Sequence, residues 1–170
     1  VLGARRGAEL NQLVAEISCN GGQAVCLAGD VCDESYTIAL VELAVAQYGR
    51  LDVAFNNAGT MGPLGPTPEV TLADWQRTLD TNLTAMFLAA KYQLPAMLRA
   101  GSGSLIFTST FVGHTAGIAG AAAYAASKSG IIGLTQALAS EFGPQGLRVN
   151  ALLPGGTDTP MAHEMNGSPE

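Results

Sequence analysis

Short apolar segments recur along this chain, and polar or glycine-rich residues directly follow several of them. The clearest is 51–55, a near-continuous apolar run typical of a strand that is covered on both faces. It leads into Asn56-Asn57-Ala58-Gly59, and similar junctions follow the segments 104–108 and 147–153. Stretches with helical spacing of apolar residues separate these runs. This alternation predicts right-handed βαβ units and an open, doubly wound parallel sheet with helices on both faces, an α/β fold in three layers.

The expected elements divide the whole chain without a linker or an internal repeat, so residues 1–170 are interpreted as one domain. We expect strands at 1–4, 24–28, 51–55, 104–108 and 147–153. We expect helices at 7–20, from Asp33 as N-cap to about 48, and at 72–80, 82–99 and 121–142. The remaining stretches are expected to be loops, at 60–70 with its three prolines, at 109–120 and from 154 onward.

Composition excludes several classes of function. The net charge is −6 and Lys91 and Lys128 are the only lysines, so no nucleic-acid partner is expected. No apolar run reaches the length of a membrane span, and the first residues have no signal-peptide pattern, which favours a cytoplasmic protein. Cys19, Cys26 and Cys32 are odd in number and lack metal-ligand spacing, so no disulfide framework and no metal site are expected.

One pair of residues in the 121–142 helix suggests chemistry. Tyr124 and Lys128 are four residues apart, so they lie on one helix face, roughly 6 Å apart at their Cβ atoms. A phenol has an ordinary pKa of about 10 and is a poor acid or base near neutral pH. We expect the ammonium of Lys128 to favour the phenolate of Tyr124 and so to permit proton transfer.

The pair, the Asn56-Asn57-Ala58-Gly59 turn, Ser109-Thr110 and Pro154-Gly155-Gly156-Thr157 together resemble the classical branch of the short-chain dehydrogenase/reductase family, over nearly the whole chain. The resemblance implies a Rossmann-like fold in which Tyr124 is the acid/base and Lys128 binds the nicotinamide ribose. It implies that Asn82 holds a water for proton relay. A hydroxyl beside the tyrosine binds the substrate carbonyl: Thr110-Phe111-Val112-Gly113 fits the S-x-x-G register, so Thr110 is favoured and Ser109 is the alternative, although Thr110 lies 14 residues before Tyr124 where the family has about 13.

The resemblance also implies the residues that bind a cofactor. Ala4 occupies the position of the acid that selects NAD, and an arginine suits a 2′-phosphate, so NADP is expected as cofactor and NAD is less favoured. Arg5 is the first candidate for that phosphate and Arg6 the second. An adenine site is implied at Asp30 and Val31, and close approach of the backbone at Asn56, Ala58 and Gly59. The nicotinamide carboxamide is assigned to Pro154, Gly155, Thr157 and Thr159, and residues 161–170 to the start of a substrate lid.

A glycine-rich phosphate-binding turn is absent from any strand-to-helix setting in this sequence. The resemblance implies a central strand carrying that turn before Val1 and another strand after Glu170, so we interpret the chain as an internal fragment. Strands in a sheet lie about 4.8 Å apart, so without the central strand a gap of roughly 10 Å is expected between the strands at 1–4 and 51–55. Their facing edges would then be unpaired.

The function that the resemblance implies is an NADP-dependent oxidoreductase acting on a carbonyl or secondary alcohol. Reduction of a 3-oxoacyl thioester and reduction of a small ketone both fit, and a non-catalytic dinucleotide-binding protein of the same fold is the alternative. An NAD-linked dehydrogenase running in the oxidative direction is disfavoured by Ala4-Arg5. By analogy the protein is a homodimer or homotetramer, and two small-residue or apolar helix faces permit this, although core packing explains them equally well: Ala85-Ala89-Ala90 and Ile131-Leu134-Ala137-Leu138.

Overall fold

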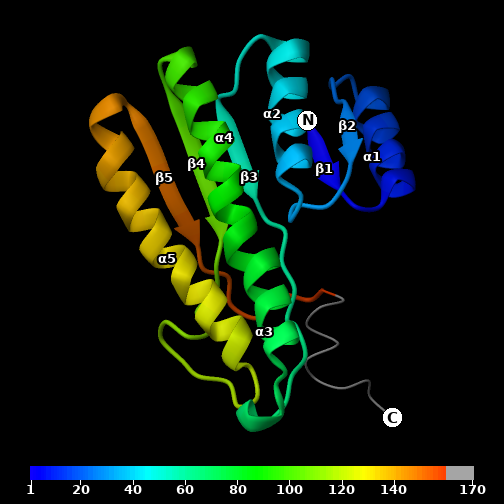
Figure 1. The fold of residues 1–170 in the computed structure, drawn as a ribbon. Coiled ribbons are helices and arrows are strands. Elements are labelled where there is room, and N and C mark those ends of the chain that lie inside the picture. The colour runs from blue at the N-terminus through cyan, green and yellow to red at the C-terminus, as the bar shows by residue number, and fades with distance from the viewer. Residues whose placement is uncertain (160–170) are drawn as a thin grey trace.

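The computed structural model describes residues 1–159, in which strands and helices alternate as predicted (Figure 1). The strands are β1 (Leu2–Ala4), β2 (Cys26–Ala28), β3 (Val53–Asn56), β4 (Gly103–Thr108) and β5 (Leu147–Leu152). The α-helices are α1 (Gly7–Cys19), α2 (Glu34–Tyr48), α3 (Leu72–Leu79), α4 (Ala85–Ala100) and α5 (Ala122–Phe142). Short 3-10 turns lie at Thr67–Glu69 and Gly143–Gln145.

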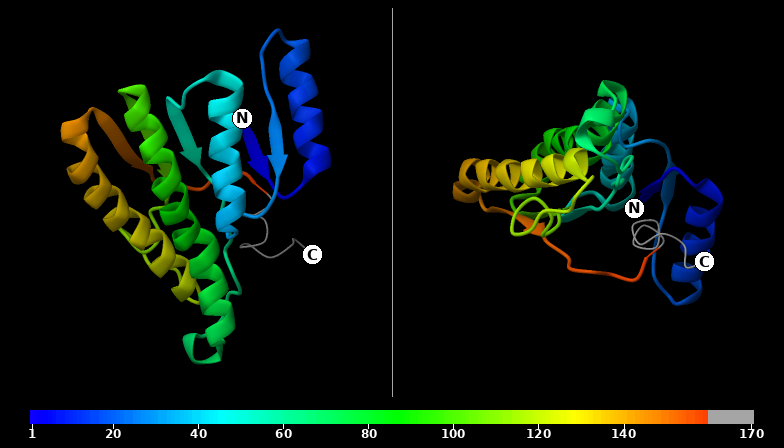
Figure 2. Two further views of the ribbon diagram at one scale, coloured as in Figure 1. Left: turned by 45° about the horizontal axis from the view of Figure 1, so that its top comes forward. Right: turned by 90° about the horizontal axis from the view of Figure 1, so that it is seen from below.

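All strand pairs are parallel, which confirms the predicted α/β class. β1 pairs with β2, and β4 lies between β3 and β5. Helices α2, α4 and α5 lie on one side of the strands and α1 lies on the other, so the elements form three layers (Figure 2). The carboxyl ends of all five strands lie at one edge of the fold (Figure 1), which is where such folds place their sites.

A gap separates the two groups of strands, as predicted. No hydrogen bonds join β1 to β3, and a cavity of about 510 Å³ lies between them. The apolar run of β3 was expected to be covered on both faces, but Val53 and Phe55 are 59% and 56% exposed, while Ala54 between them is buried. Within residues 1–159, helices therefore cover only one face of this strand.

Local sequence signals account for the ends of α2. The carboxylate of Asp33 accepts a hydrogen bond from the backbone N–H of Ser35 at 2.8 Å, so the predicted N-cap is confirmed. At the other end Gly49 has φ +78°, a left-handed conformation that glycine adopts without steric cost.

The second half of the chain contains a longer helical unit than predicted. Helices expected at 72–80 and 82–99 are joined without a break by a π-helical turn at Asp80–Thr84. Asn82 lies in this turn and is completely buried. Since π-turns inside α-helices are frequent at functional sites, the turn favours a functional role for Asn82.

The main core lies between β4 and the helices α4 and α5. Its fully buried side chains include Met97, Leu105, Phe107 and Ile131. Ala85, Ala89 and Ala90, which were considered for a subunit interface, are buried inside this chain, as is Ile131. Core packing therefore explains these positions, and the large apolar side chain that α4 exposes is Phe87.

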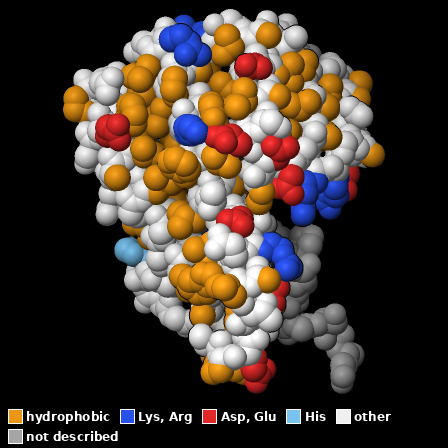
Figure 3. Space-filling view, viewed as in Figure 1, with side chains coloured by type: hydrophobic (Ala, Val, Ile, Leu, Met, Phe, Trp, Pro, Cys, Tyr) orange, Lys and Arg blue, Asp and Glu red, His pale blue; other side chains and the backbone are white. Residues whose placement is uncertain are grey.

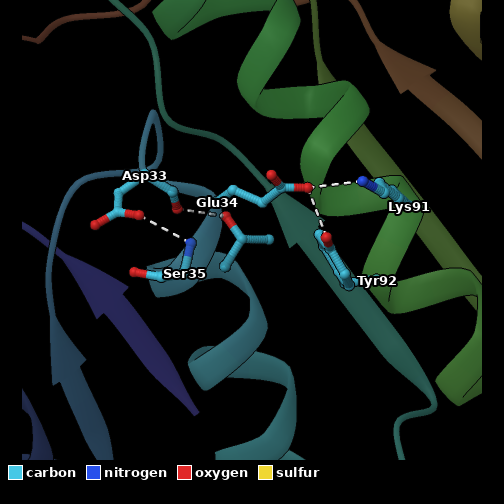
Figure 4. Close-up of polar contacts among 6 residues, drawn as sticks. Asp33, Glu34, Ser35, Lys91 and Tyr92 are labelled. Carbon is cyan, nitrogen blue, oxygen red and sulfur yellow. Dashed lines mark hydrogen bonds and ion pairs between the residues drawn. The ribbon is translucent and has the colours of Figure 1, made fainter.

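A polar cluster links α2 to α4. The carboxylate of Glu34, in the first turn of α2, accepts hydrogen bonds from the Lys91 ammonium at 2.7 Å and the Tyr92 hydroxyl at 2.5 Å (Figure 4). These bonds lower the pKa of Glu34, the lysine bond contributing most. The cluster thus joins the β1–β2 part of the fold to the β3–β5 part across the gap.

The surface carries few basic groups. On the face shown in Figure 3, Lys and Arg side chains are scattered and hydrophobic side chains are widespread. Among residues 1–159 no helix is both long and apolar enough to span a membrane, and no group of acidic, His or Cys side chains is arranged to hold a metal ion. Cys19, Cys26 and Cys32 are all free thiols.

Candidate active site

Tyr124 and Lys128 lie one turn apart on α5 and are both buried, with 8% and 4% exposure. Helix α5 packs on β5, which places the pair beside the carboxyl ends of the strands. The Lys128 ammonium donates a hydrogen bond to the carbonyl oxygen of Thr108, the last residue of β4, at 2.7 Å. Burial lowers the pKa of Lys128 to about 8.

The pKa of the Tyr124 phenol is shifted in the direction opposite to the one predicted from the sequence. Burial raises the pKa of Tyr124 above its ordinary value, and the hydrogen bond with Thr110 lowers it by less. The expectation that the lysine would favour the phenolate is therefore wrong for this structure, because the Nζ of Lys128 is bound to Thr108 and the phenol is desolvated. At neutral pH Tyr124 is a protonated donor.

The two candidate hydroxyls next to the tyrosine point to different partners. The Ser109 hydroxyl is buried and donates to the carbonyl oxygen of Lys128 at 2.8 Å. The Thr110 hydroxyl bonds to Tyr124 and accepts a long contact of 3.3 Å from the N–H of Val112. Thr110 is thus the candidate hydroxyl that bonds to the Tyr124 side chain, and Ser109 instead bonds to the backbone of α5.

Asn82 binds two segments with its side-chain amide. Its Oδ1 accepts from the Thr60 N–H at 2.8 Å, and its Nδ2 donates to the Thr60 carbonyl at 2.8 Å and to the Ser127 hydroxyl at 3.0 Å. Ser127 in turn donates to the Tyr124 carbonyl at 2.8 Å. Both amide donors are therefore used by protein groups. Asn82 was predicted to hold a water. The only side-chain group left for that water is the second lone pair of Oδ1.

Gly59 lies where this cluster meets the cavity between β1 and β3. A Cβ atom on Gly59 would be 3.1 Å from Lys128 Nζ and 3.3 Å from Asn82 Oδ1, which is tighter than ordinary contact. Glycine therefore lets the turn after β3 approach both side chains. The predicted residues that line the same cavity are Arg5, Arg6, Asp30, Val31, Asn56, Ala58 and Gly59.

The cavity is lined by groups suited to a nucleotide. Arg5 is exposed and makes no ion pair within residues 1–159, while the Arg6 guanidinium is 2.9 Å from Glu9. The Asp30 carboxylate accepts a bond from the backbone N–H of Cys32 at 2.9 Å, which fixes the turn after β2. These residues fit the adenosine and 2′-phosphate parts of a dinucleotide. No glycine-rich turn among the described residues fits its pyrophosphate.

Two side chains that anchor the turn after β3 were not predicted. Asn56 and Gln93 of α4 exchange reciprocal amide hydrogen bonds at 2.8 and 3.0 Å, and the Thr108 hydroxyl donates to Asn57 Oδ1 at 2.9 Å. The sequence signal for Gln93 is a lone glutamine among the apolar residues of the helix, although the sequence does not reveal that Asn56 is its partner.

The segment after β5 runs along the carboxyl edge of the strands toward β1 and β2 (Figure 2). Pro154, Gly155, Thr157 and Thr159 belong to it but do not line the cavity. The Thr157 hydroxyl contacts the Gly155 carbonyl at 3.3 Å. The lid predicted for 161–170 lies outside the described residues.

Parallel strands whose carboxyl ends carry polar and glycine-rich turns, between layers of helices, define the class of dinucleotide-binding α/β folds. Comparison with known proteins identifies the family. The family model described as short chain dehydrogenase matches residues 1–169. The chain therefore belongs to the short chain dehydrogenase family.

Similar proteins span a range of named activities. The chain is 38% identical to a cyclohexanol dehydrogenase of Acinetobacter sp. over 153 residues, which are 90% of this chain and 61% of that protein. It is 35% identical to a 3-oxoacyl-[acyl-carrier-protein] reductase of Synechocystis sp., with coverage of 98% and 66%. The crystal structure of levodione reductase superposes with a TM-score of 0.91 at 33% identity, covering 96% of this chain and 64% of that one.

The chain spans about three fifths of the length of the curated relatives that match it first. Two similar solved structures contain a nicotinamide cofactor. One is a 7α-hydroxysteroid dehydrogenase with NADH, at 28% identity and a TM-score of 0.85, with coverage of 91% of this chain and 59% of that one. The other is a metagenomic short-chain oxidoreductase with NADP, at 35% identity and a TM-score of 0.84, with coverage of 91% and 70%.

Proposed function

We propose that this protein is an NADP-dependent oxidoreductase that interconverts a carbonyl group and a secondary alcohol, with Tyr124 as the acid/base. The observation that carries the proposal is the buried cluster in which Thr110 bonds to Tyr124 and Lys128 lies one turn away. The cluster meets the cavity between β1 and β3, the proposed nucleotide site, at Gly59. When bound, the cofactor supplies or accepts the hydride.

The side chains of this protein supply the proton that the carbonyl oxygen takes up during reduction. Tyr124 is protonated at neutral pH, because burial raises its pKa, so its hydroxyl donates a proton to the carbonyl oxygen during reduction. The Thr110 hydroxyl is a second donor for the same oxygen and stabilises the negative charge that develops there. Lys128, whose ammonium is held by the Thr108 carbonyl, binds the ribose next to the nicotinamide.

The preference for NADP rests on Arg5. Its guanidinium is exposed, has no ion-pair partner among residues 1–159 and lines the cavity, whereas Arg6 is paired with Glu9. A bidentate guanidinium suits a 2′-phosphate. We expect Arg5→Ala to weaken NADPH binding about tenfold or more and to leave NADH binding unchanged, with Arg6→Ala as the matched control. Nicotinamide fluorescence is the readout, since Trp75 borders a different hollow from the cavity at Arg5.

The substrate is proposed as a small ketone, a cyclic or other secondary alcohol, or a 3-oxoacyl thioester. The names of the relatives span these groups, from cyclohexanol dehydrogenase to 3-oxoacyl-[acyl-carrier-protein] reductase.

A cytoplasmic location and assembly as a homodimer or homotetramer belong to the same proposal. Free thiols at all three cysteines suit a reducing compartment, and Phe87 on α4 offers an apolar contact for a second copy.

The decisive experiment compares turnover with cofactor binding in the full-length protein. We expect Tyr124→Phe to lower kcat by at least about 100-fold while NADPH binding changes little, because only the proton donor is lost. The control is Tyr48→Phe, an exposed tyrosine at the end of α2. If the wild type binds NADPH but turns over no ketone or alcohol in a broad panel, the non-catalytic dinucleotide-binding protein replaces the enzyme.

A further inference from the structure

Two loops flank the reactive side of Tyr124. The first follows β3 and the second joins β4 to α5. Buried Met61 from the first and Val112 and Ala121 from the second form one apolar cluster with the tyrosine, and Ile118 packs against it. Neither loop contains an Asp, Glu, Lys or Arg residue between 57 and 68 or between 109 and 123. The walls nearest the proposed reacting oxygen are therefore apolar and uncharged.

The two loops are held together by their backbones. The N–H of Gly65 donates to the carbonyl oxygen of Gly120 at 3.0 Å, and a Cβ on Gly120 would lie 3.1 Å from the Gly65 nitrogen. Gly120 has φ +79°, which favours glycine. The Ser129 hydroxyl also fixes the second loop to α5 by donating to the Gly113 carbonyl at 2.7 Å. These contacts hold the apolar walls in one arrangement.

The polar groups around these walls already have protein partners. The Ser109 hydroxyl is bound to the Lys128 carbonyl, and the Asn82 amide to Thr60 and Ser127. The Lys128 ammonium is bound to Thr108 and is almost completely buried. His114 is exposed in the second loop and does not belong to the apolar cluster around Tyr124. Within residues 1–159, the Tyr124 cluster therefore offers a carboxylate next to the reacting carbon no cation that is free of protein partners.

We infer that the substrate of this site is uncharged close to the reacting carbon: a ketone, an oxo ester or oxo thioester, or the corresponding alcohol, and not a free 2- or 3-oxo acid. Placing a carboxylate between these walls removes its hydration without providing a partner, which disfavours binding strongly. We expect a charge several bonds away from the carbonyl to be tolerated better, because it would lie outside the apolar cluster around Tyr124. The inference rests on the proposed oxidoreductase activity and defines which carbonyl compounds the same site accepts.

The test is a set of competition assays at pH 8 with the full-length protein and NADPH. Ethyl 3-oxobutanoate competes with 3-oxobutanoate, and methyl 4-oxocyclohexanecarboxylate competes with its free acid. We expect kcat/KM for the first ester to exceed that for its acid by at least about 100-fold, and the second pair to differ by less. Equal or faster reduction of 3-oxobutanoate overturns the inference. If NADPH binds but no member of either pair, nor any ketone in a broad panel, is reduced, the proposed function fails instead and the inference falls with it.

A pair of matched variants tests the role of the walls directly. Ile118→Lys adds a cation beside the apolar cluster, and Leu72→Lys makes the same kind of change at an 80% exposed position on α3, outside the cluster. We expect Ile118→Lys to reduce the preference for ethyl 3-oxobutanoate at least about tenfold by offering the acid a partner. Leu72→Lys is expected to leave the preference unchanged. An unchanged preference in a folded Ile118→Lys protein contradicts the inference.

Discussion

Asn82 is the residue whose removal is expected to disturb most of the site. It is completely buried in the π-helical turn and makes three side-chain hydrogen bonds, two to the backbone of Thr60 and one to Ser127. In Asn82→Ala the Thr60 N–H and carbonyl lose their partners, while Ser127 keeps its bond to the Tyr124 carbonyl. The variant therefore leaves two backbone groups unsatisfied.

The expected loss of stability follows from these two groups. A buried polar group without a partner costs about 1–3 kcal/mol. Thr60 is only partly buried, so water reaches it in part and the lower half of that range applies. Two such groups, less about 0.5 kcal/mol returned by the helix propensity of alanine, give about 3 kcal/mol. For a domain of this size that lowers the Tm by about 9 °C.

Thermal unfolding of the full-length protein measures this effect, with Asn11→Ala as the control. Asn11 is an exposed asparagine on α1 whose Oδ1 accepts a 3.3 Å bond from the Cys26 thiol, so its loss is expected to lower the Tm by no more than about 2 °C. Thr60 adjoins Gly59, where a Cβ atom would be 3.1 Å from Lys128 Nζ, so we also expect kcat to fall in Asn82→Ala. A Tm equal to that of the control refutes the assigned network. A large fall in Tm with unchanged kcat refutes its role in positioning the site.

Three further predictions concern other contacts of the site. Below pH 8 the folded protein carries the buried Lys128 ammonium, and its desolvation lowers the free energy of unfolding. This destabilisation disappears as the pH rises from about 8 toward 10.5, because the unfolded chain binds more protons than the folded one in that range. The unfolding free energy of the wild type, measured in urea at pH 7 and pH 10, should thus rise by about 3 kcal/mol relative to Lys128→Met, and a pH-independent difference contradicts this. Gln93→Leu leaves the Asn56 amide unpaired and should cost about 2 kcal/mol, whereas adding Asn56→Leu should cost little more; additive costs in this double-mutant cycle exclude the coupling. Thr110→Val should lower kcat about 100-fold with Thr110→Ser near wild type, while Ser109→Ala should mainly lower the Tm; the reverse pattern would make Ser109 the substrate-binding hydroxyl.

Periodicity and end signals were sufficient to predict the order of the elements. The Asp33 cap and the apolar run of β3 are local features, and the parallel arrangement follows from the alternation of strands and helices. The gap between β1 and β3 followed from the expected sheet order together with the missing glycine-rich turn. Exact ends were less accurate, since β2 begins at Cys26 and the expected break near Asp80 is a continuous π-turn.

Contacts between distant parts of the chain were not predictable in the same way. Gln93 is 37 residues from Asn56, and Asn82 is 22 residues from Thr60, so neither pair follows from local spacing. The direction of the Tyr124 pKa depends on how far packing against Met61 and Val112 excludes water. Likewise a stripe of small residues such as Ala85, Ala89 and Ala90 does not reveal whether it faces the core or a partner.

The segment 56–59, at the end of β3 and directly after it, connects the two halves of the site, and each of its anchors belongs to a different element. Asn56 is held by Gln93 of α4, Asn57 by Thr108 of β4, and the residue after the segment, Thr60, by Asn82 of the π-turn. Gly59 lies between these anchors, at a position where a Cβ atom would crowd both Lys128 Nζ and Asn82 Oδ1. A shift of this segment therefore changes the cavity lining and the surroundings of the lysine together. Only the side of this segment that faces the cavity is suited to contact a nucleotide. Even so, we expect a substitution at any of the three anchors to weaken cofactor binding and to slow proton transfer together.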